Sequence, residues 1–347
     1  MAYTTINKSS DYFNTKLYTG TGSQLAVSSV GFQPDLVWTK NRVVNYSNWL
    51  FDVVRGVNKG LRTDNTGGES DNATRQVSFD SDGFTLGANA DVNVNTNTYA
   101  SWNWKAGTSV SGNTTGSGTA KTYTGSVNTT SGFSIIKYTG NGTAGHTIPH
   151  NLGVAPTFRI TKRLNSVSDW PIYNEVLGNT KEIKFTTTAS GTTTNYWNST
   201  SPNATNFTLG TNGISNENGS EFISYNFTPI QGYSKFGSYI GNGNADGTFV
   251  YTGFKPAFVI VKATSTTSDW NIMDNKRAVS FNPNTKELYA NSNSVEATGG
   301  QTIRDYLSNG FKLRGTSGGT NGSGVSYIYM AFGQSIVGSN NVPNNAR

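Results

Sequence analysis

One pattern occurs three times in this chain of 347 residues, and it constrains the fold more than any other feature. Its anchor is a proline that enters an apolar segment, as in Gly253-Phe-Lys-Pro-Ala-Phe-Val-Ile-Val-Lys262. Pro34, Pro156 and Pro256 occupy the same place in the three copies and are spaced by 122 and 100 residues. A repeat of this length indicates three structural units of similar architecture.

Four further anchors, one before the proline and three after it, recur in the same order and at nearly the same spacing in each copy. They are Tyr18, Tyr138 and Tyr239 before a Gly-rich turn; Trp49, Trp170 and Trp270 after a Ser-Asn or Ser-Asp pair; Phe84, Phe207 and Phe311; and the closing strands that start at Tyr99, Phe222 and Tyr327. The anchors have apolar residues at alternate positions, which is the period of a β-strand. Asn-Gly and Gly-rich turns separate them. We therefore predict an all-β chain of three tandem antiparallel β-sandwich domains, with a jelly-roll-like arrangement expected in each.

The anchors also set the expected domain boundaries. We predict repeats at residues 1–106, 122–229 and 233–332. The Gly, Ser and Thr composition of residues 107–121 predicts a flexible linker, whereas only a short joint separates the second and third repeats. Residues 333–347 are expected to form a C-terminal tail that lies extended on a neighbour or hangs free. The first joint should accordingly be loose and the second tight.

Composition excludes several classes of protein. The net charge is +6, but no run of Lys or Arg provides the concentrated positive patch that nucleic acids require. There is no cysteine, hence no disulfide and no thiolate metal site. No apolar run is long enough to cross a bilayer, and the N-terminus has no signal-peptide core, so we expect a soluble product made in a cytoplasm. Aromatic residues make up 12% of the chain, which argues against overall disorder.

Two motifs have the residues of a metal site, but each has a simpler explanation. His146 and His150 are four residues apart, a metal-binding spacing in a helix, yet Pro149 argues against a helix there and the other copies have no such pair. Asp80 and Asp82 look like the start of a calcium loop, although the third copy lacks both carboxylates. We expect a loop role for the histidines and an Asx-Gly turn at the aspartates, and no metal or other cofactor.

The repeated tryptophans are the main candidates for a ligand site. Exposed indole rings at Trp49, Trp170 and Trp270 could stack on sugars, but their retention in otherwise divergent copies favours a role in the core. Less repeated loops are better candidates for contacts with partners, because loops vary on a stable scaffold. These loops are residues 63–76, 190–204 and 284–304.

Catalysis finds little support in the sequence. No serine has the surroundings of a nucleophile elbow. A pair of carboxylates could hydrolyse glycosides, but no acidic residue recurs in all three copies. Asp52 and Asp274 correspond to one another, and the second copy has Asn174 at that position. We therefore expect a protein that is not an enzyme.

Taken together, the repeated motifs resemble a repeat in structural proteins of marine bacteriophages. The segments that carry the resemblance are Tyr-Ile-Gly-Asn-Gly243, the strand from Gly253 to Lys262, Ser-Asp-Trp270, Leu-Ser-Asn-Gly-Phe-Lys-Leu-Arg314 and Tyr-Ile-Tyr-Met-Ala-Phe332. The similarity extends over nearly the whole chain and is strongest in the third copy. It implies a tail-fibre-like or simply structural virion protein built from a domain of about 100 residues whose function is unknown. The resemblance supplies no catalytic or ligand residue.

Three functions are therefore considered. The leading one is a virion protein that binds the host receptor as tail fibres do, with other virion proteins of the tail or capsid, a host surface glycan and copies of itself in a homotrimer as expected partners. The second is a head-decoration protein that stiffens the capsid, which the lack of a long segment before the first repeat favours. The third is a virion-associated polysaccharide depolymerase. In each case the expected location is the virion, without bound nucleic acid or membrane insertion.

Overall fold

The computed structural model describes residues 4–189, 191–278, 282–299 and 302–335. Within these residues nearly all regular structure is antiparallel β-sheet. The helical segments described are a 3-10 turn (Ser9–Asp11) and two one-turn helices, α1 (Ala90–Asn93) and α2 (Gly213–Asn216). The prediction of an all-β fold is confirmed.

Each repeat is a sandwich of a large and a small sheet. In repeat 1 the large sheet has the order β1 (Phe13–Thr19), β9 (Thr98–Trp104), β3 (Leu36–Asn41), β4 (Trp49–Asp52), β5 (Lys59–Arg62), β6 (Ser70–Asp71), and the small sheet β2 (Leu25–Val27), β8 (Gly83–Leu86), β7 (Gln76–Asp80). In repeat 3 the large sheet is β21 (Ser234–Ile240), β29 (Ser326–Gly333), β23 (Pro256–Ala263), β24 (Asn271–Asp274), β25 (Lys286–Tyr289), β26 (Ala297–Thr298), and the small sheet β22 (Phe249–Tyr251), β28 (Gly310–Leu313), β27 (Arg304–Leu307).

Repeat 2 has two additional strands in its large sheet, and the third strand of its small sheet lies at the opposite edge from that in repeats 1 and 3. Its large sheet is β10 (Thr108–Asn113), β12 (Thr122–Asn128), β13 (Phe133–Thr139), β20 (Glu221–Phe227), β15 (Phe158–Arg163), β16 (Pro171–Asn174), β17 (Lys181–Lys184), β18 (Thr192–Thr193), and its small sheet β11 (Thr115–Gly116), β14 (His146–Pro149), β19 (Asn206–Leu209). A jelly roll divides eight strands between two sheets. Here the strands after the proline anchor, such as β3 to β6, instead form a meander within the large sheet.

The large sheets are buried on both faces. In β29, Tyr327 and Tyr329 point outward into the core between the two sheets of repeat 3. Ile328, Met330 and Phe332 point the opposite way, into a core that residues of all three repeats share. Alternate side chains of one strand therefore contribute to two cores, the outer core inside each sandwich and the central core between the three sandwiches.

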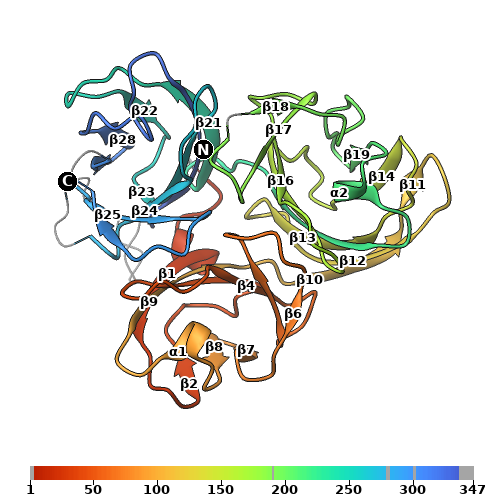
Figure 1. Cartoon of the computed structure of the whole chain (residues 1–347), viewed down its shortest axis with the longest axis horizontal. Helices are drawn as coiled ribbons and strands as arrows, with labels where there is room; N and C mark the ends of the chain where they lie inside the picture. Colours follow the sequence, from red (N-terminus) through yellow and green to blue (C-terminus); the bar gives the residue numbers. More distant parts are fainter. Residues whose placement is uncertain (1–3, 190, 279–281, 300–301, 336–347) are drawn as a thin grey trace.

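The three repeats surround a common centre, with the small sheets on the outer side (Figure 1). The equivalent residues Trp104, Phe227 and Phe332 meet there, with ring centroids 6.5 Å apart for the first pair, 6.0 Å for the second and 5.7 Å for Trp104 and Phe332. Aromatic pairs at such distances stabilise a fold by about 0.5–1.5 kcal/mol each beyond the area they bury. The chain is thus arranged as a pseudo-trimer, with a threefold relationship between its own repeats.

Inside each sandwich, the repeated tyrosines form one stacked pair per copy. The pairs are Tyr18–Tyr99, Tyr138–Phe222 and Tyr239–Tyr327, with ring centroids 4.9, 5.2 and 4.9 Å apart. The hydroxyl of the first tyrosine in each pair donates a hydrogen bond to a backbone carbonyl, that of Val92, Ser215 or Thr320. A buried phenol needs such an acceptor, and each repeat supplies it from the segment that precedes its closing strand.

The predicted linker at residues 107–121 is wrong. This segment contains β10 and β11, and β10 pairs with β12 from Thr108–Val127 to Asn113–Thr122. Gly, Ser and Thr are common in flexible chains, but an edge strand that faces solvent on both sides tolerates them as well. The difference between a loose and a tight joint also disappears, because all three repeats pack on the same central core.

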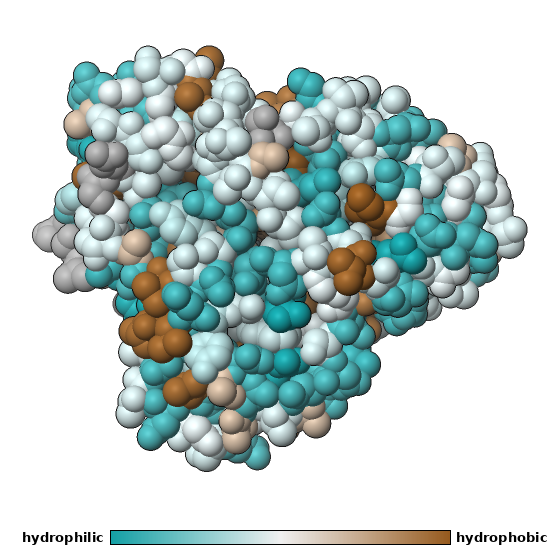
Figure 2. All heavy atoms as spheres, viewed as in Figure 1, coloured by the Kyte–Doolittle hydropathy of each residue, from teal (hydrophilic) through white to brown (hydrophobic). Residues whose placement is uncertain are grey.

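The two ends of the described chain meet at the boundary between repeats 1 and 3. The backbone amide of Ser10 donates to the hydroxyl of Ser335 at 3.2 Å, and the hydroxyl of Ser9 donates to the carbonyl of Gln334 at 3.4 Å. Residues 336–347, most of the predicted tail, lie outside the described residues. On the face shown in Figure 2, polar residues predominate and hydrophobic residues form only small separate patches.

Candidate functional site

Two of the three repeated tryptophans connect neighbouring repeats. Trp170 and Trp270 are completely buried in the central core. The indole Nε1 of Trp170 donates to the carbonyl of Arg62 at 3.0 Å, and that of Trp270 donates to the carbonyl of Lys184 at 2.8 Å. Neither ring is available to stack on a sugar, so the structure places both in a packing role.

Trp49 is not equivalent to the other two. It lies within β4 and pairs with Thr39, whereas Trp170 immediately precedes β16. A shift of one residue turns a side chain to the opposite face of a strand. The ring of Trp49 accordingly packs in the outer core of repeat 1, where the guanidinium carbon of Arg75 lies 3.8 Å from its centroid.

The residue that corresponds to Trp170 and Trp270 in repeat 1 is Asn48. Its Nδ2 atom donates to the carbonyl of Tyr289 at 3.0 Å, and Tyr289 holds the same place in repeat 3 as Arg62 and Lys184 hold in the other repeats. A short amide therefore makes the same contact between repeats that an indole makes at the other two boundaries.

A lysine at the end of the anchor strand crosses each boundary. The ammonium groups of Lys40, Lys162 and Lys262 donate to the carbonyl oxygens of Asn293, Thr66 and Thr188, at 2.9, 2.9 and 2.8 Å. Repeat 1 thus reaches repeat 3, repeat 2 reaches repeat 1, and repeat 3 reaches repeat 2. Contacts that run in one direction and close on themselves are those of a cyclic trimer.

These lysines are buried without a carboxylate at bonding distance. Burial lowers the pKa of Lys40, Lys162 and Lys262 to about 8. Each ammonium also donates to a carbonyl of its own repeat, that of Tyr46, Ser168 or Ser268. The perturbed pKa values therefore belong to structural cross-links, although such values also occur at catalytic sites.

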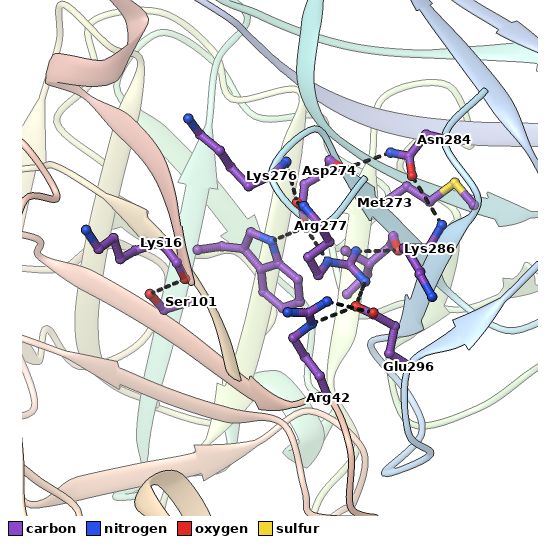
Figure 3. Close-up of polar contacts among 12 residues, drawn as sticks. Lys16, Arg42, Ser101, Met273, Asp274, Lys276, Arg277, Asn284, Lys286 and Glu296 are labelled. Carbon is purple, nitrogen blue, oxygen red and sulfur yellow. Dashed lines mark hydrogen bonds and ion pairs between the residues drawn. The ribbon is translucent and has the colours of Figure 1, made fainter. Parts of the chain in front are cut away.

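The boundary between repeats 1 and 3 contains a buried network of charges (Figure 3). Arg277 Nε donates to Asp274 Oδ2 at 2.6 Å, and both side chains are fully buried. Its Nη1 atom donates to Glu296 at 3.1 Å, and Arg42 of repeat 1 binds the same carboxylate through two hydrogen bonds of 2.9 and 2.8 Å. The indole Nε1 of Trp102 donates to Asp274 Oδ2 at 3.0 Å. Paired in this way, the charges form a cross-link between the repeats.

The boundary between repeats 1 and 2 has a similar network, and among the described residues the third boundary lacks one. Arg55 Nε donates to Asp52 at 2.5 Å, and the hydroxyl of Tyr225 from repeat 2 donates to the same carboxylate at 2.7 Å. At the equivalent positions of the third boundary stand Asn174, Leu177 and Met330. The carboxylates of Asp52 and Asp274, which we considered as members of a catalytic pair, are thus bound by hydrogen-bond donors within the chain.

The two histidines have structural partners. His146 Nδ1 lies 2.9 Å from Asn216 Oδ1, and its Nε2 lies 2.7 Å from the hydroxyl of Thr114. His150 Nε2 lies 2.9 Å from the carbonyl of Asn203, while its Nδ1 accepts from the amide of Leu152. Both rings are fully buried, and burial lowers the pKa of each. His146 lies at the start of β14 and not in a loop as predicted, whereas His150 follows that strand. Both rings connect neighbouring segments of repeat 2.

The aspartates of the apparent calcium loop bind donors of the chain itself. Asp82 accepts from the backbone amides of Ser29 and Gly31, at 3.1 and 2.6 Å. Asp80 accepts from the hydroxyls of Ser78 and Thr85, at 2.6 and 2.7 Å. Residues 81 and 82 form the two-residue turn between β7 and β8, and Asp82 ties this turn to the segment after β2. Within the part of the chain that the structure describes, no group of three or more metal-ligating side chains comes together.

The loops that we expected to contact other molecules partly contact neighbouring repeats. Glu69 donates from its backbone amide to Leu164, Gly191 to Thr264, and Glu296 to Arg42. These three residues lie at equivalent points of the predicted loops 63–76, 190–204 and 284–304. The contacts between repeats were not predicted, but the sequence contains a signal for them. Lys40, Lys162 and Lys262 at the end of each anchor strand keep the spacing of 122 and 100 residues.

Comparison with known proteins identifies a family without indicating an activity. Among the described residues no helix is both long and apolar enough to cross a bilayer. No curated protein matches the chain, and no solved structure matches it. One family, described as a domain of unknown function (DUF7483), matches residues 8–335 in a single stretch that includes all three repeats. The chain therefore belongs to the family of the domain of unknown function DUF7483.

Proposed function

We propose that the protein is a non-enzymatic structural component of a bacteriophage virion, exposed on the particle, and that it binds the host receptor in the manner of a tail fibre. Its partners would be other virion proteins of the tail or capsid and a glycan on the host surface. It would act in the virion, without inserting into a membrane or binding nucleic acid.

The observation that carries this proposal is the closed central core. The aromatic residues Trp104, Phe227 and Phe332 from three repeats meet in one cluster, and ordered cross-links surround it. Such a body resists deformation, because no repeat can move without opening the core. A rigid body with polar loops on its outside suits an exposed attachment protein. The resemblance of the repeated motifs to marine phage structural proteins points in the same direction.

Saturated polar groups support a role without catalysis. The carboxylates of Asp52 and Asp274 each bind an arginine and an aromatic side chain of another repeat. The rings of His146 and His150 are hydrogen-bonded at both nitrogens. A general acid or base must reach a substrate, and these groups are committed to the fold.

A head-decoration protein is the second candidate, and the compact arrangement in Figure 1 favours it. Three lobes around one centre form no shaft, whereas a fibre is elongated. A decoration protein attaches through its side to a capsid and needs only a compact body. Association into a homotrimer remains a prediction for either role, although one chain already contains a threefold arrangement.

Position and copy number in purified particles test the proposal. Mass spectrometry of the particles establishes whether the protein is present, and electron microscopy with labelled antibody locates it. A few copies at the tail support the receptor-binding role, whereas hundreds of copies over the head support decoration. Absence from washed particles would contradict both. Cleavage of host polysaccharide by the purified protein would instead favour a depolymerase.

Receptor binding has its own test. Purified protein added before infection should compete with particles for host cells and reduce adsorption. A protein that neither binds host cells nor reduces adsorption would contradict the receptor-binding role and leave the decoration role in place.

A further inference from the structure

A polar cavity of about 260 Å³ lies in repeat 3 between the β23–β24 loop, β25 and the loop that follows β28. Exposed Thr267 lies at its rim, and the fully buried residues Asn271 and Thr320 contribute to its wall together with Tyr289 and Ser317. Hydroxyl, amide and phenol groups thus surround a space of the size of one small ligand.

The same place in repeat 1 is filled with apolar side chains. Asn271 pairs with Val261 in repeat 3 as Trp49 pairs with Thr39 in repeat 1, so the two are equivalent. Thr320 takes the place of Val92, since Tyr239 donates to the carbonyl of Thr320 as Tyr18 donates to that of Val92. Trp49 and Val92 both pack in the outer core of repeat 1. Repeat 3 has polar residues at both positions and a cavity.

Polar groups around this cavity are held firmly but not all are satisfied. Asn271 Nδ2 donates to Glu287 Oε2 at 2.6 Å, and its Oδ1 accepts from Arg304, which fixes the amide in one orientation. Among the described residues the Thr320 hydroxyl has no hydrogen-bond partner, although the side chain is 1% exposed. Unsatisfied buried groups are costly to a fold, so each requires an explanation.

We propose that this cavity binds one neutral sugar unit of a glycan, an assignment that rests on the proposed receptor-binding function. A sugar hydroxyl both donates and accepts, which matches the hydroxyl of Thr320 and the other hydroxyl groups of the wall. The half-buried ring of Tyr289 offers an apolar surface to a pyranose face. The charged residue among those that line the cavity is Asp269, so an anionic ligand would meet like charge, whereas Glu287 and Arg304 both bind Asn271 from behind and offset one another.

Direct binding of defined sugars tests the site. Saturation-transfer NMR on the full chain with glucose, galactose, mannose and N-acetylglucosamine should give transfer to at least one of them, and a glycan array should show binding to a glycan that contains that sugar. No transfer and no array binding by the folded wild type would overturn the proposal.

Two variants locate the binding. Thr320→Val keeps the shape, copies Val92 of repeat 1 and removes an unsatisfied hydroxyl, so the protein should fold normally while the sugar binds roughly tenfold more weakly. Thr267→Trp acts at the exposed rim and should block entry. Ser215→Ala at the position in repeat 2 that corresponds to Thr320 is the matched control and should bind as the wild type does. Sugar binding that both cavity variants retain would refute this location.

Host adsorption separates the failure of the site from the failure of the function. If sugars bind to wild type but not to Thr320→Val, and the protein nevertheless does not bind host cells, the cavity is a sugar site and the receptor-binding role is wrong. If host cells bind wild type and Thr320→Val equally and no sugar binds, the receptor-binding role stands and the site is wrong.

Discussion

The indole Nε1 of Trp102 donates a 3.0 Å hydrogen bond to Oδ2 of Asp274, which is 172 residues away in the chain and in another repeat. Tyr225 repeats this relationship with Asp52 at 2.7 Å across the next boundary. At the third boundary Met330 stands where the donor would be. Two of the three boundaries therefore have a buried charge that depends on a donor from the neighbouring repeat.

Replacing the donor should weaken the whole fold. In Tyr225→Phe the ring stays in place and Asp52 keeps Arg55 but loses a buried hydrogen bond, and a charged acceptor left short of a partner costs about 1–3 kcal/mol. Urea unfolding should show a lower midpoint with the same slope. Met330→Leu at the equivalent position is the control and should cost less than about 1.5 kcal/mol, because no hydrogen bond is lost. Equal effects of the two substitutions would mean that the bond contributes nothing.

Removing one or both members of the buried ion pair should have opposite consequences. Arg277→Leu leaves Asp274 as an unpaired buried carboxylate and should cost about 3–5 kcal/mol. Asp274→Asn/Arg277→Leu reproduces the Asn174 and Leu177 of repeat 2 and should recover most of that loss. A double-mutant cycle by urea unfolding measures the coupling. A double variant as unstable as Arg277→Leu would contradict this interpretation.

The common core should make the three repeats unfold together. Calorimetry of the full chain should give one transition whose calorimetric and van't Hoff enthalpies agree. Limited proteolysis should leave residues 107–121 intact, since β10 and β11 are paired in sheets. Separate transitions, or early cleavage within this segment, would support the loose linker that the sequence suggested.

The sequence predicted what depends on local alternation and missed what depends on contacts between repeats. Strands and sandwiches followed from apolar residues at every second position. The shared core was not predicted, yet β29 contains a signal for it, because Tyr327 and Tyr329 on one face and Ile328, Met330 and Phe332 on the other are all hydrophobic. A strand that is apolar on both faces is buried on both.

All three repeated tryptophans are buried, but Trp49 is not equivalent to the other two, and the spacing shows why. Trp49 and Trp170 are 121 residues apart, whereas Asp52 and Asn174 keep the 122 residues of the prolines. This difference of one residue reverses the face on which the ring lies. The cavity of repeat 3 could not be predicted from the sequence either, because it depends on Asn271 and Thr320, which are 49 positions apart in the chain and come together only in the fold.

Acid should destabilise the protein through the two histidines. Burial lowers the pKa of His146 and of His150, so below the ordinary value of about 6.5 the unfolded chain takes up protons that the folded chain does not bind. Stability then rises with pH across this window and falls as the pH decreases through it. The urea midpoint of the wild type should therefore be lower at pH 5.5 than at pH 7.5, because histidine titrates between these two pH values. In His146→Gln/His150→Gln the drop should be smaller, whatever the stability of the variant at pH 7.5. An equal drop in both proteins would assign the acid sensitivity to other groups.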